Sequence, residues 1–302
     1  MREGFTFGID GGATRSRLAV QDTDGNRVRS VTGGPTNLYT GKPEEAALHL
    51  RELFDQVKEF GPFKAGCIGS AGLGREQERN TFSSILETLL PSVPVKLCSD
   101  GEILLTGGLG GPEGYALISG TGSIAMSRTK KGKTIRSGGY GYLLGDEGSA
   151  YWIAHQALMR SLRSLDGRDL PTAMLERLLE ACALQKSEEL VSYVHHKASK
   201  ADIASLAPIV TTFAIQEDPL ALAILEQAAR ELVALVKAVQ NPEIQNNELV
   251  VAGGVLEHDP VVRPLFERFL SERLEHLVLI ESRGTALDGA CLLARDLERK
   301  EK

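Results

Sequence analysis

The sequence predicts an α/β protein built from two related domains. Its 302 residues are more than one ordinary core holds and enough for two domains of usual size. Strand and helix patterns follow one another in the order β-β-β-α-β-α-β up to about residue 98. A second strand-turn-strand-turn-strand unit then matches the first at a constant offset of 107 residues. The matched positions are Thr14, Ser16 and Gly25 in the first copy and Thr121, Ser123 and Gly132 in the second.

The elements of the first half follow from alternating apolar residues and from glycine-rich turns. We expect strands at 5–9, 17–20 and 28–31 with a hairpin turn at 22–26, a helix at 43–60, strands at 65–70 and 93–98, and a helix at 75–90 between the last two strands. The segment Pro112-Glu113, after a run of glycines, is the best domain boundary. The predicted domains are therefore 1–112, completed by a C-terminal helix at 286–302, and 113–285.

The second half repeats this start and then becomes helical. We expect strands at 115–118 and 124–126, a hairpin turn at 130–133, a helical insertion over 147–237, strands at 249–252 and 277–280, and a final helix at 284–297.

Composition excludes several classes of function. The formal net charge is −6 and no basic stripe stands out, which argues against a nucleic-acid partner. No apolar run reaches the roughly 18 residues of a membrane span, and the first residues lack the apolar region of a signal peptide. The four cysteines form no CxxC pair, which argues against a disulfide framework and a zinc site. We therefore expect a cytoplasmic protein without a membrane partner.

Two glycine turns at matched positions of the repeat are candidate phosphate sites. The first contains Asp10, Gly11, Gly12 and Thr14, and the second contains Gly120, Thr121 and Gly122. Glycines let backbone N–H groups close around phosphate oxygens, and each threonine adds a hydroxyl donor. Asp10 could hold Mg²⁺ through water, since Mg²⁺ keeps several waters and takes few carboxylates. The alternative is an ordinary tight turn in each case. Neither turn is a Walker loop.

A second group of candidates consists of polar side chains and glycines at predicted strand ends. Asp100 follows the strand 93–98, where open α/β sheets place ligands, so its carboxylate could accept the proton of an attacking hydroxyl. The alternative is an N-cap for the helix near Glu102. Gly253 and Gly254 follow the strand 249–252 and would let an adenine ring lie against the backbone, or form a plain strand-to-helix turn.

Two further polar residues could contact a sugar. Asp146, in the glycine-rich segment 138–149, could accept hydrogen bonds from two sugar hydroxyls. The alternative is that Asp146 or Ser149 caps the next helix. Asn37, in a loop, could donate to and accept from a sugar, or form an Asx-turn.

Taken in order, these motifs resemble the N-acetylglucosamine kinase family over nearly the whole chain. That family lies within the superfamily of sugar kinases, actin and heat-shock chaperone ATPases. The matching segments are Gly8-Ile9-Asp10-Gly11-Gly12-x-Thr14-x-Ser16, Gly34-Pro35-Thr36-Asn37, Ser99-Asp100, Ile118 to Ser123, Gly138 to Gly141 with Gly145 to Trp152, and Ala252-Gly253-Gly254-Val255.

The resemblance implies two actin-like (ribonuclease H-like) ATPase domains with a cleft between them, which close on ATP, Mg²⁺ and an amino sugar. It implies that Asp100 is the catalytic base and that phosphate goes to the 6-hydroxyl of N-acetylglucosamine; it favours a homodimer. Residues matching sugar-binding positions are Asn37, Gly139 and Asp146, and those matching nucleotide positions are Asp10, Thr14, Thr121 and Gly254.

Three positions depart from the family pattern. They are Ala13 in place of a third glycine, Ser137 where some relatives carry cysteine, and Arg283-Gly284-Thr285 where small residues are usual. Ser137 precedes the region that would meet the N-acetyl group, so glucosamine and N-acetylmuramate stay open as substrates.

A hypothesis from another class is an ATPase activator that drives a partner reductase or dehydratase. Activators of that kind carry cysteines for an iron–sulfur cluster. Here Cys67 and Cys98 fall on expected buried strands, and Cys182 and Cys291 on expected helices, which argues against this alternative.

Overall fold

The computed structural model describes residues 4–12, 14–37, 42–70, 72–73 and 76–300. The chain divides into two compact units. Unit 1 comprises Met1–Gly114, Arg128–Thr134 and Glu281–Lys302, and unit 2 comprises Tyr115–Ser127 and Ile135–Ile280.

Unit 1 is built on a five-stranded mixed sheet with the strand order β3-β2-β1-β4-β5. Its strands are β1 (Thr6–Gly11), β2 (Ser16–Gln21), β3 (Arg27–Gly33), β4 (Ala65–Ser70) and β5 (Val95–Cys98). The first three strands pair antiparallel, whereas β1, β4 and β5 run parallel. The carboxyl ends of these three parallel strands therefore meet at one edge of the sheet.

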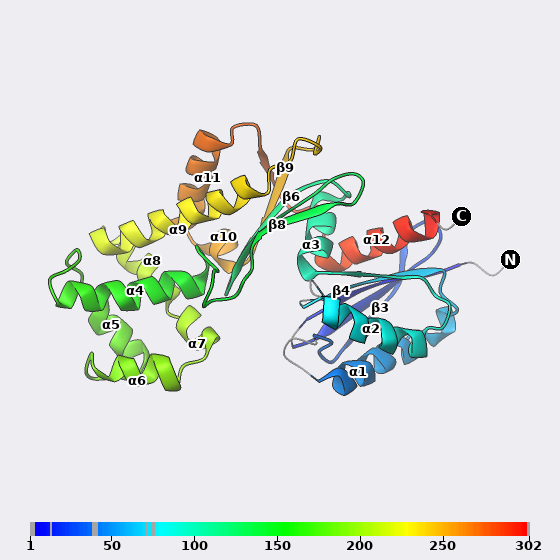
Figure 1. Cartoon of the computed structure of the whole chain (residues 1–302), viewed down its shortest axis with the longest axis horizontal. Helices are drawn as coiled ribbons and strands as arrows, with labels where there is room; N and C mark the ends of the chain where they lie inside the picture. Colours follow the sequence, from blue (N-terminus) through cyan, green and yellow to red (C-terminus); the bar gives the residue numbers. More distant parts are fainter. Residues whose placement is uncertain (1–3, 13, 38–41, 71, 74–75, 301–302) are drawn as a thin grey trace. The chain divides into compact units, whose positions relative to one another are not determined.

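Helices cover both faces of this sheet (Figure 1). They are α1 (Pro43–Asp55), α2 (Glu76–Leu89), α3 (Asp100–Leu109) and α12 (Ala286–Lys300). Phe7 and Ile9 of β1 pack with α1 and α2, while α3 and α12 pack on the other face. A Cβ on Gly289 of α12 would lie 1.8 Å from the Ile103 carbonyl oxygen of α3, so a side chain there would force the two helices apart.

The sheet of unit 2 has the order β10-β9-β6-β7-β8. Its strands are β6 (Gly114–Ser119), β7 (Ser123–Arg128), β8 (Thr134–Gly138), β9 (Glu248–Ala252) and β10 (Val278–Ile280). Read from its other edge, the order of this sheet is β8-β7-β6-β9-β10. The strands β6, β7, β8, β9 and β10 therefore occupy the positions that β1, β2, β3, β4 and β5 occupy in the sheet of unit 1. Gly25 and Gly132, the matched hairpin glycines, have φ angles of 91° and 90°. The structure therefore confirms the predicted internal repeat.

The helices of unit 2 pack into one large apolar core with its sheet. They are α4 (Ala150–Leu165), α5 (Met174–Ala181), α6 (Glu189–His196), α7 (Lys200–Ala204), α8 (Ala207–Ile215), α9 (Pro219–Ala238), α10 (Gly254–His258) and α11 (Val262–Arg273). None of the helices in the described part of the chain combines the length and apolar character that a bilayer crossing requires.

Some predicted element bounds differ from the structure. The first helix ends at Asp55 rather than residue 60, because Val57 turns into the core and a short 3₁₀ helix, Lys58–Phe60, follows. The helix expected near Glu102 begins at Asp100, because Ser99 caps it. The long helix after the glycine-rich segment begins only at Ala150, because Ser149 is its N-cap.

Candidate active site

The predicted site residues fall into two groups, one in each unit. Unit 1 carries Asp10, Gly11, Gly12, Thr14, Asn37 and Asp100, and unit 2 carries Gly120, Thr121, Gly122, Gly139, Asp146, Gly253 and Gly254. Ala13 lies outside the described residues.

In unit 1 the parallel strands bring Asp10 and Asp100 to the same sheet edge. Asp10 of β1 is paired in register with Gly69 of β4, and Gly69 is paired with Cys98 of β5, two residues before Asp100. The two carboxylates are close enough for the charge of Asp10 to raise the pKa of Asp100. This edge therefore collects negative charge, which suits a site that handles a cation or a proton.

Asp10 is held by an ion pair across the first hairpin. Its Oδ2 accepts a hydrogen bond from the Arg17 guanidinium of β2 at 2.7 Å, and its side chain is 20% exposed. Arg17 thereby holds one of the two carboxylate oxygens of Asp10. Such a carboxylate fits Mg²⁺ held through water better than direct ligation, because Arg17 already competes for the charge.

The turn after β1 is backed by a cluster of buried hydroxyl groups. The Gly12 amide donates to the Arg15 carbonyl at 3.1 Å, closing the turn. A Cβ on Gly11 would lie 2.5 Å from Thr36 Oγ1, which is itself 2.8 Å from Ser16 Oγ. Thr36 thereby ties the loop that carries the buried Asn37 to the turn. Thr14 is exposed at the tip, where its hydroxyl is accessible.

Asp100 is the first residue of α3 and is not its N-cap, so that alternative is wrong. Ser99 is the cap: its Oγ accepts from the Glu102 amide at 3.3 Å, and Glu102 Oε2 accepts from the Ser99 amide at 3.0 Å. The Asp100 carboxylate accepts a hydrogen bond from the adjacent Gly101 amide at 3.0 Å. The sequence could have revealed this cap, because Ser99-x-x-Glu102 is a capping box.

The environment of Asp100 raises the pKa of its carboxyl group. Burial raises the pKa of its carboxyl group above the ordinary value, the backbone amides of Gly101 and Asp100 lower it in part, and the charge of Asp10 raises it. The side chain nevertheless reaches solvent, and the hydration that remains limits the rise. Asp100 is thus an accessible carboxylate that binds a proton more readily than a free aspartate does.

In unit 2 the glycine turn between β6 and β7 is fastened to the segment before α4. The Gly120 amide donates to the Gly122 carbonyl at 3.0 Å, and the Gly120 carbonyl accepts from the Ala150 amide at 2.8 Å. Ser119 Oγ donates to the Gly148 carbonyl at 2.9 Å. Thr121 is exposed, as is its repeat partner Thr14, so both turns present a hydroxyl at the same place.

The side chain of Asp146 contacts the β6–β7 turn. It has a φ of 62°, its Oδ1 accepts from the Ser123 amide at 3.3 Å, and its Oδ2 lies 2.8 Å from Lys200 Nζ. A Cβ on Gly122 would approach the same Oδ2 to 2.9 Å, so only glycine fits there without a shift. A carboxylate accepts about four hydrogen bonds, so lone pairs remain after these two contacts.

Lys200 is not among the site residues predicted from the sequence. It lies on α7, 54 residues from Asp146 along the chain, and reaches it because α7 packs beside α4. No local motif marks this lysine, since its meaning depends on the packing of the helical insertion.

The remaining glycines among the predicted site residues differ in whether a side chain would fit at their positions. A Cβ on Gly253, where φ is 95°, would lie 2.4 Å from the Ser119 carbonyl oxygen, which makes glycine necessary for β9 to pass the turn. Gly254 has no heavy atom within 4 Å of the position a Cβ would take. Gly139 has a φ of 69°, and a Cβ there would lie 2.7 Å from Ile124 Cδ1.

The departure at Arg283 to Thr285 has a structural explanation within unit 1. Arg283 Nη1 donates to the Leu109 carbonyl at 2.7 Å, near the end of α3. Thr285 Oγ1 accepts from the Asp288 amide at 3.3 Å at the start of α12.

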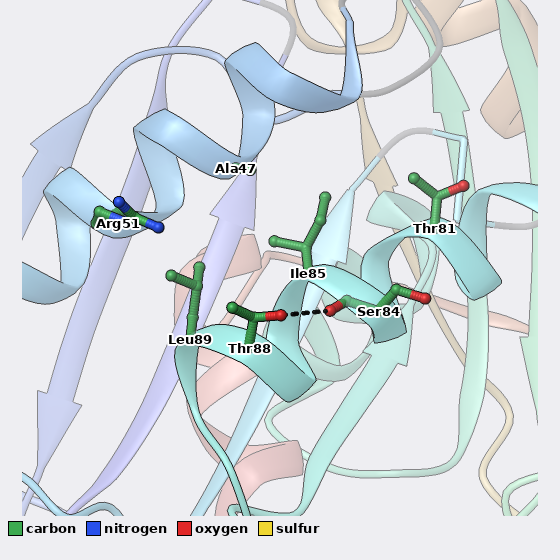
Figure 2. Close-up of a pocket in the computed structure, with 7 residues that line it drawn as sticks. All are labelled: Ala47, Arg51, Thr81, Ser84, Ile85, Thr88 and Leu89. Carbon is green, nitrogen blue, oxygen red and sulfur yellow. Dashed lines mark hydrogen bonds between the residues drawn. The ribbon is translucent and has the colours of Figure 1, made fainter.

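A surface groove of about 460 Å³ lies elsewhere, between α1 and α2 (Figure 2). Its lining residues are Ala47, Arg51, Thr81, Ser84, Ile85, Thr88 and Leu89, none of which is a predicted site residue. Thr81, Ser84 and Thr88 each donate to a carbonyl of their own helix. The groove is therefore separate from the candidate active site.

All four cysteines are buried, which argues against the activator hypothesis. Burial raises the pKa of the Cys67 thiol far above its ordinary value and that of Cys291 to about 12. A cluster ligand has to be a thiolate that the metal can reach. Cys182 follows the last residue of α5, and the other three lie on the elements predicted for them.

The sequence profile of the BadF/BadG/BcrA/BcrD ATPase family matches residues 7–294. The chain belongs to this family. Membership of this ATPase family implies the use of ATP. The family match and the two five-stranded sheets together confirm the predicted family resemblance and the predicted pair of actin-like domains.

Several proteins similar in sequence to this chain are named as amino sugar kinases. An N-acetylmuramic acid/N-acetylglucosamine kinase of Clostridium acetobutylicum is 33% identical over 96% of this chain and 98% of its own length. An N-acetyl-D-glucosamine kinase of Dictyostelium discoideum is 28% identical over 97% and 98%. The crystal structure of a candidate N-acetylglucosamine kinase from Chromobacterium violaceum has a TM-score of 0.72 and 26% identity, covering 97% of this chain and 100% of that one.

Proposed function

We propose that this protein is an ATP-dependent amino sugar kinase that transfers the γ-phosphoryl group of ATP to the 6-hydroxyl of N-acetylglucosamine. The observation that carries the proposal is an accessible Asp100 carboxylate at the carboxyl edge of the unit 1 sheet, relieved of capping by Ser99. Family membership and the kinases of similar sequence support the same reaction class.

Asp100 acts as the general base in this proposal. Phosphoryl transfer depends mainly on positioning and charge stabilisation, and a base takes the proton of the attacking hydroxyl. A base has to be ionised before the transfer and able to bind a proton during it. Solvent access supports the first requirement, and the raised pKa supports the second.

The two glycine turns bind the nucleotide. Thr14 in one unit and Thr121 in the other donate their hydroxyls to the phosphates, and the glycines beside them, Gly11, Gly12, Gly120 and Gly122, leave room for phosphate oxygens to approach the backbone. Asp10 would hold Mg²⁺ through water, and the ion would supply charge that neutralises the phosphates. Gly253 and Gly254 take the adenine, in keeping with the open space at Gly254.

The sugar contacts come from Asn37, Gly139 and Asp146. Asp146 retains lone pairs for two hydroxyls although Lys200 and Ser123 already contact it. We also propose that the domains are 1–112 with 286–302 and 113–285, that the protein is a homodimer, and that it works in the cytoplasm.

A panel of sugars with ATP, read by ADP release, tests the reaction class. The panel contains N-acetylglucosamine, glucosamine, N-acetylmuramate, glucose and glycerol. We expect the highest kcat/KM with an N-acetylated amino sugar. A best turnover with glucose or glycerol, or ADP release independent of any sugar, would contradict the proposal.

A further inference from the structure

The loop that carries Asn37 rests against helix α1. Strand β3 ends at Gly33, and Gly34 follows it. A Cβ on Gly33 would lie 2.9 Å from Leu53 Cδ2, and a Cβ on Gly34 would lie 2.5 Å from His49 Nε2. His49 and Leu53 are four residues apart, which places them on the same face of α1. The backbone of two successive glycines therefore contacts two successive turns of this helix.

His49 is also tied to the loop by a hydrogen bond. Its Nδ1 lies 2.7 Å from the Pro35 carbonyl oxygen. A carbonyl oxygen can only accept, so Nδ1 carries the proton and donates it. The ring is thus held at Nδ1, while its Cδ2 and Nε2 atoms occupy the space beside Gly34. Turning the ring away from Gly34 would break its hydrogen bond to Pro35.

The two residues after Pro35 are buried. They are Thr36 and Asn37, and Thr36 Oγ1 lies 2.8 Å from Ser16 Oγ of β2. The backbone before Asn37 is therefore fixed both by α1, through His49, and by β2. Because the φ of proline is fixed and peptide bonds are planar, few torsions remain to absorb a shift before it reaches Asn37.

We propose that His49 is a positioning residue for the sugar site, which sets the place of the Asn37 amide through the backbone of Gly34 and Pro35. This inference rests on the proposed function, in which Asn37 contacts the sugar. A group that forms directional hydrogen bonds has to be held within about 0.5 Å of its productive position. His49 supplies part of that support from α1, outside the sugar contacts themselves.

The same contact explains the glycine at position 34. Gly34 is not among the glycines with a positive φ, so its backbone conformation is open to other residues. The His49 ring is what excludes a side chain, because its Cδ2 and Nε2 atoms would both lie 2.5 Å from a Cβ. Substitutions at Gly34 and His49 should therefore be energetically coupled.

The first test compares His49→Leu with His49→Asn. Leucine has no donor, whereas the asparagine amide can present an N–H near the position of Nδ1. With the amino sugar that gives the highest kcat/KM in the panel, the sugar KM should rise about 2- to 10-fold in His49→Leu, the factor for one hydrogen bond. The kcat and the KM for ATP should not change. His49→Asn should recover part of the loss.

The matched control is Leu50→Val, a change at the neighbouring residue of α1, which is buried in the core of unit 1. This variant should lower the melting temperature and leave the sugar KM unchanged. A residue with a packing role alone would behave in the same way. An unchanged sugar KM in His49→Leu therefore overturns the inference, as does an equal rise in the KM for ATP.

A double-mutant cycle with Gly34→Ala provides a second test, which holds even if His49→Leu folds poorly. Gly34→Ala leaves α1 intact and should raise the sugar KM, because its Cβ pushes the loop away from the His49 ring. In combination with His49→Ala, which removes the ring, the same substitution should have little further effect. An unchanged sugar KM in Gly34→Ala, or additive effects in the double variant, overturns the inference.

The unmodified protein separates this inference from the proposed function. Sugar-dependent ADP release there, with a sugar KM that none of the His49 and Gly34 variants changes, overturns the role of His49 and leaves the kinase assignment intact. Absence of turnover with every amino sugar removes the kinase assignment, and the inference with it.

Discussion

Replacing Asp100 by asparagine isolates the basicity of one carboxyl group. The substitution keeps the size of the side chain and its ability to accept from the Gly101 amide, which is 3.0 Å away. General-base catalysis contributes about 10²–10⁴-fold, or about 2.7–5.5 kcal/mol of barrier. We therefore expect kcat to fall by that factor while the affinity for ATP, measured by direct titration, stays the same.

The structure predicts little change in stability for the same variant. Ser99 and Glu102 continue to cap α3, so the loss at Asp100 is limited to a charge near a helix N-terminus, about 0.3–1 kcal/mol. The raised pKa of Asp100 has the opposite effect on the stability of this variant. A carboxyl group with a raised pKa stabilises the fold at acid pH and loses this contribution as the pH rises through the folded-state pKa, so asparagine removes a cost at neutral pH. The melting temperature should move by less than about 4 °C.

The matched control is Ser99→Ala, which removes the cap and leaves the carboxylate. Loss of an N-cap lowers the free energy of unfolding by about 0.5–2 kcal/mol, so this variant should have a lower melting temperature and keep most of its kcat. Steady-state ADP release and a thermal melt on both variants complete the comparison. A nearly normal kcat for Asp100→Asn, or a large fall in its melting temperature, would refute the reasoning.

Three further predictions follow from the same contacts. Gly120→Ala should leave the melting temperature unchanged, because its Cβ would have no protein atom nearer than 3.9 Å, and it should weaken ATP binding at the turn. Gly122→Ala should lower the melting temperature, because its Cβ would lie 2.9 Å from Asp146 Oδ2. Thermal melts and ATP titrations check both variants, and the opposite order of effects would contradict this prediction. Thr36→Val removes a buried hydroxyl contact with β2 and should destabilise by about 1–3 kcal/mol while raising the KM for sugar more than that for ATP, as measured by chemical denaturation and kinetics. The kcat should decrease as the pH falls through the raised pKa of Asp100, and a pH–rate profile whose acid limb persists in Asp100→Asn would assign that limb to another group.

The sequence by itself determined the fold class, the internal repeat and the family. Strand positions depend on short-range alternation, and hairpin turns depend on glycines that can adopt a positive φ, so both are visible locally. The matched glycines at 25 and 132 were recognisable for this reason, and so were the strands that place Asp10 and Asp100 after apolar runs. The bounds of the helices were less predictable, since Val57 ends α1 by turning into the core.

Only the tertiary structure decided which side chains work together. Asp146 is locally a turn residue, but its ammonium partner lies 54 residues away on an insertion helix. Thr36 matters because the fold brings its hydroxyl to Ser16 and Gly11. Gly122 is necessary because Asp146 occupies the space its side chain would need. Such partnerships depend on strand register and helix packing, which join residues that no periodicity in the chain connects.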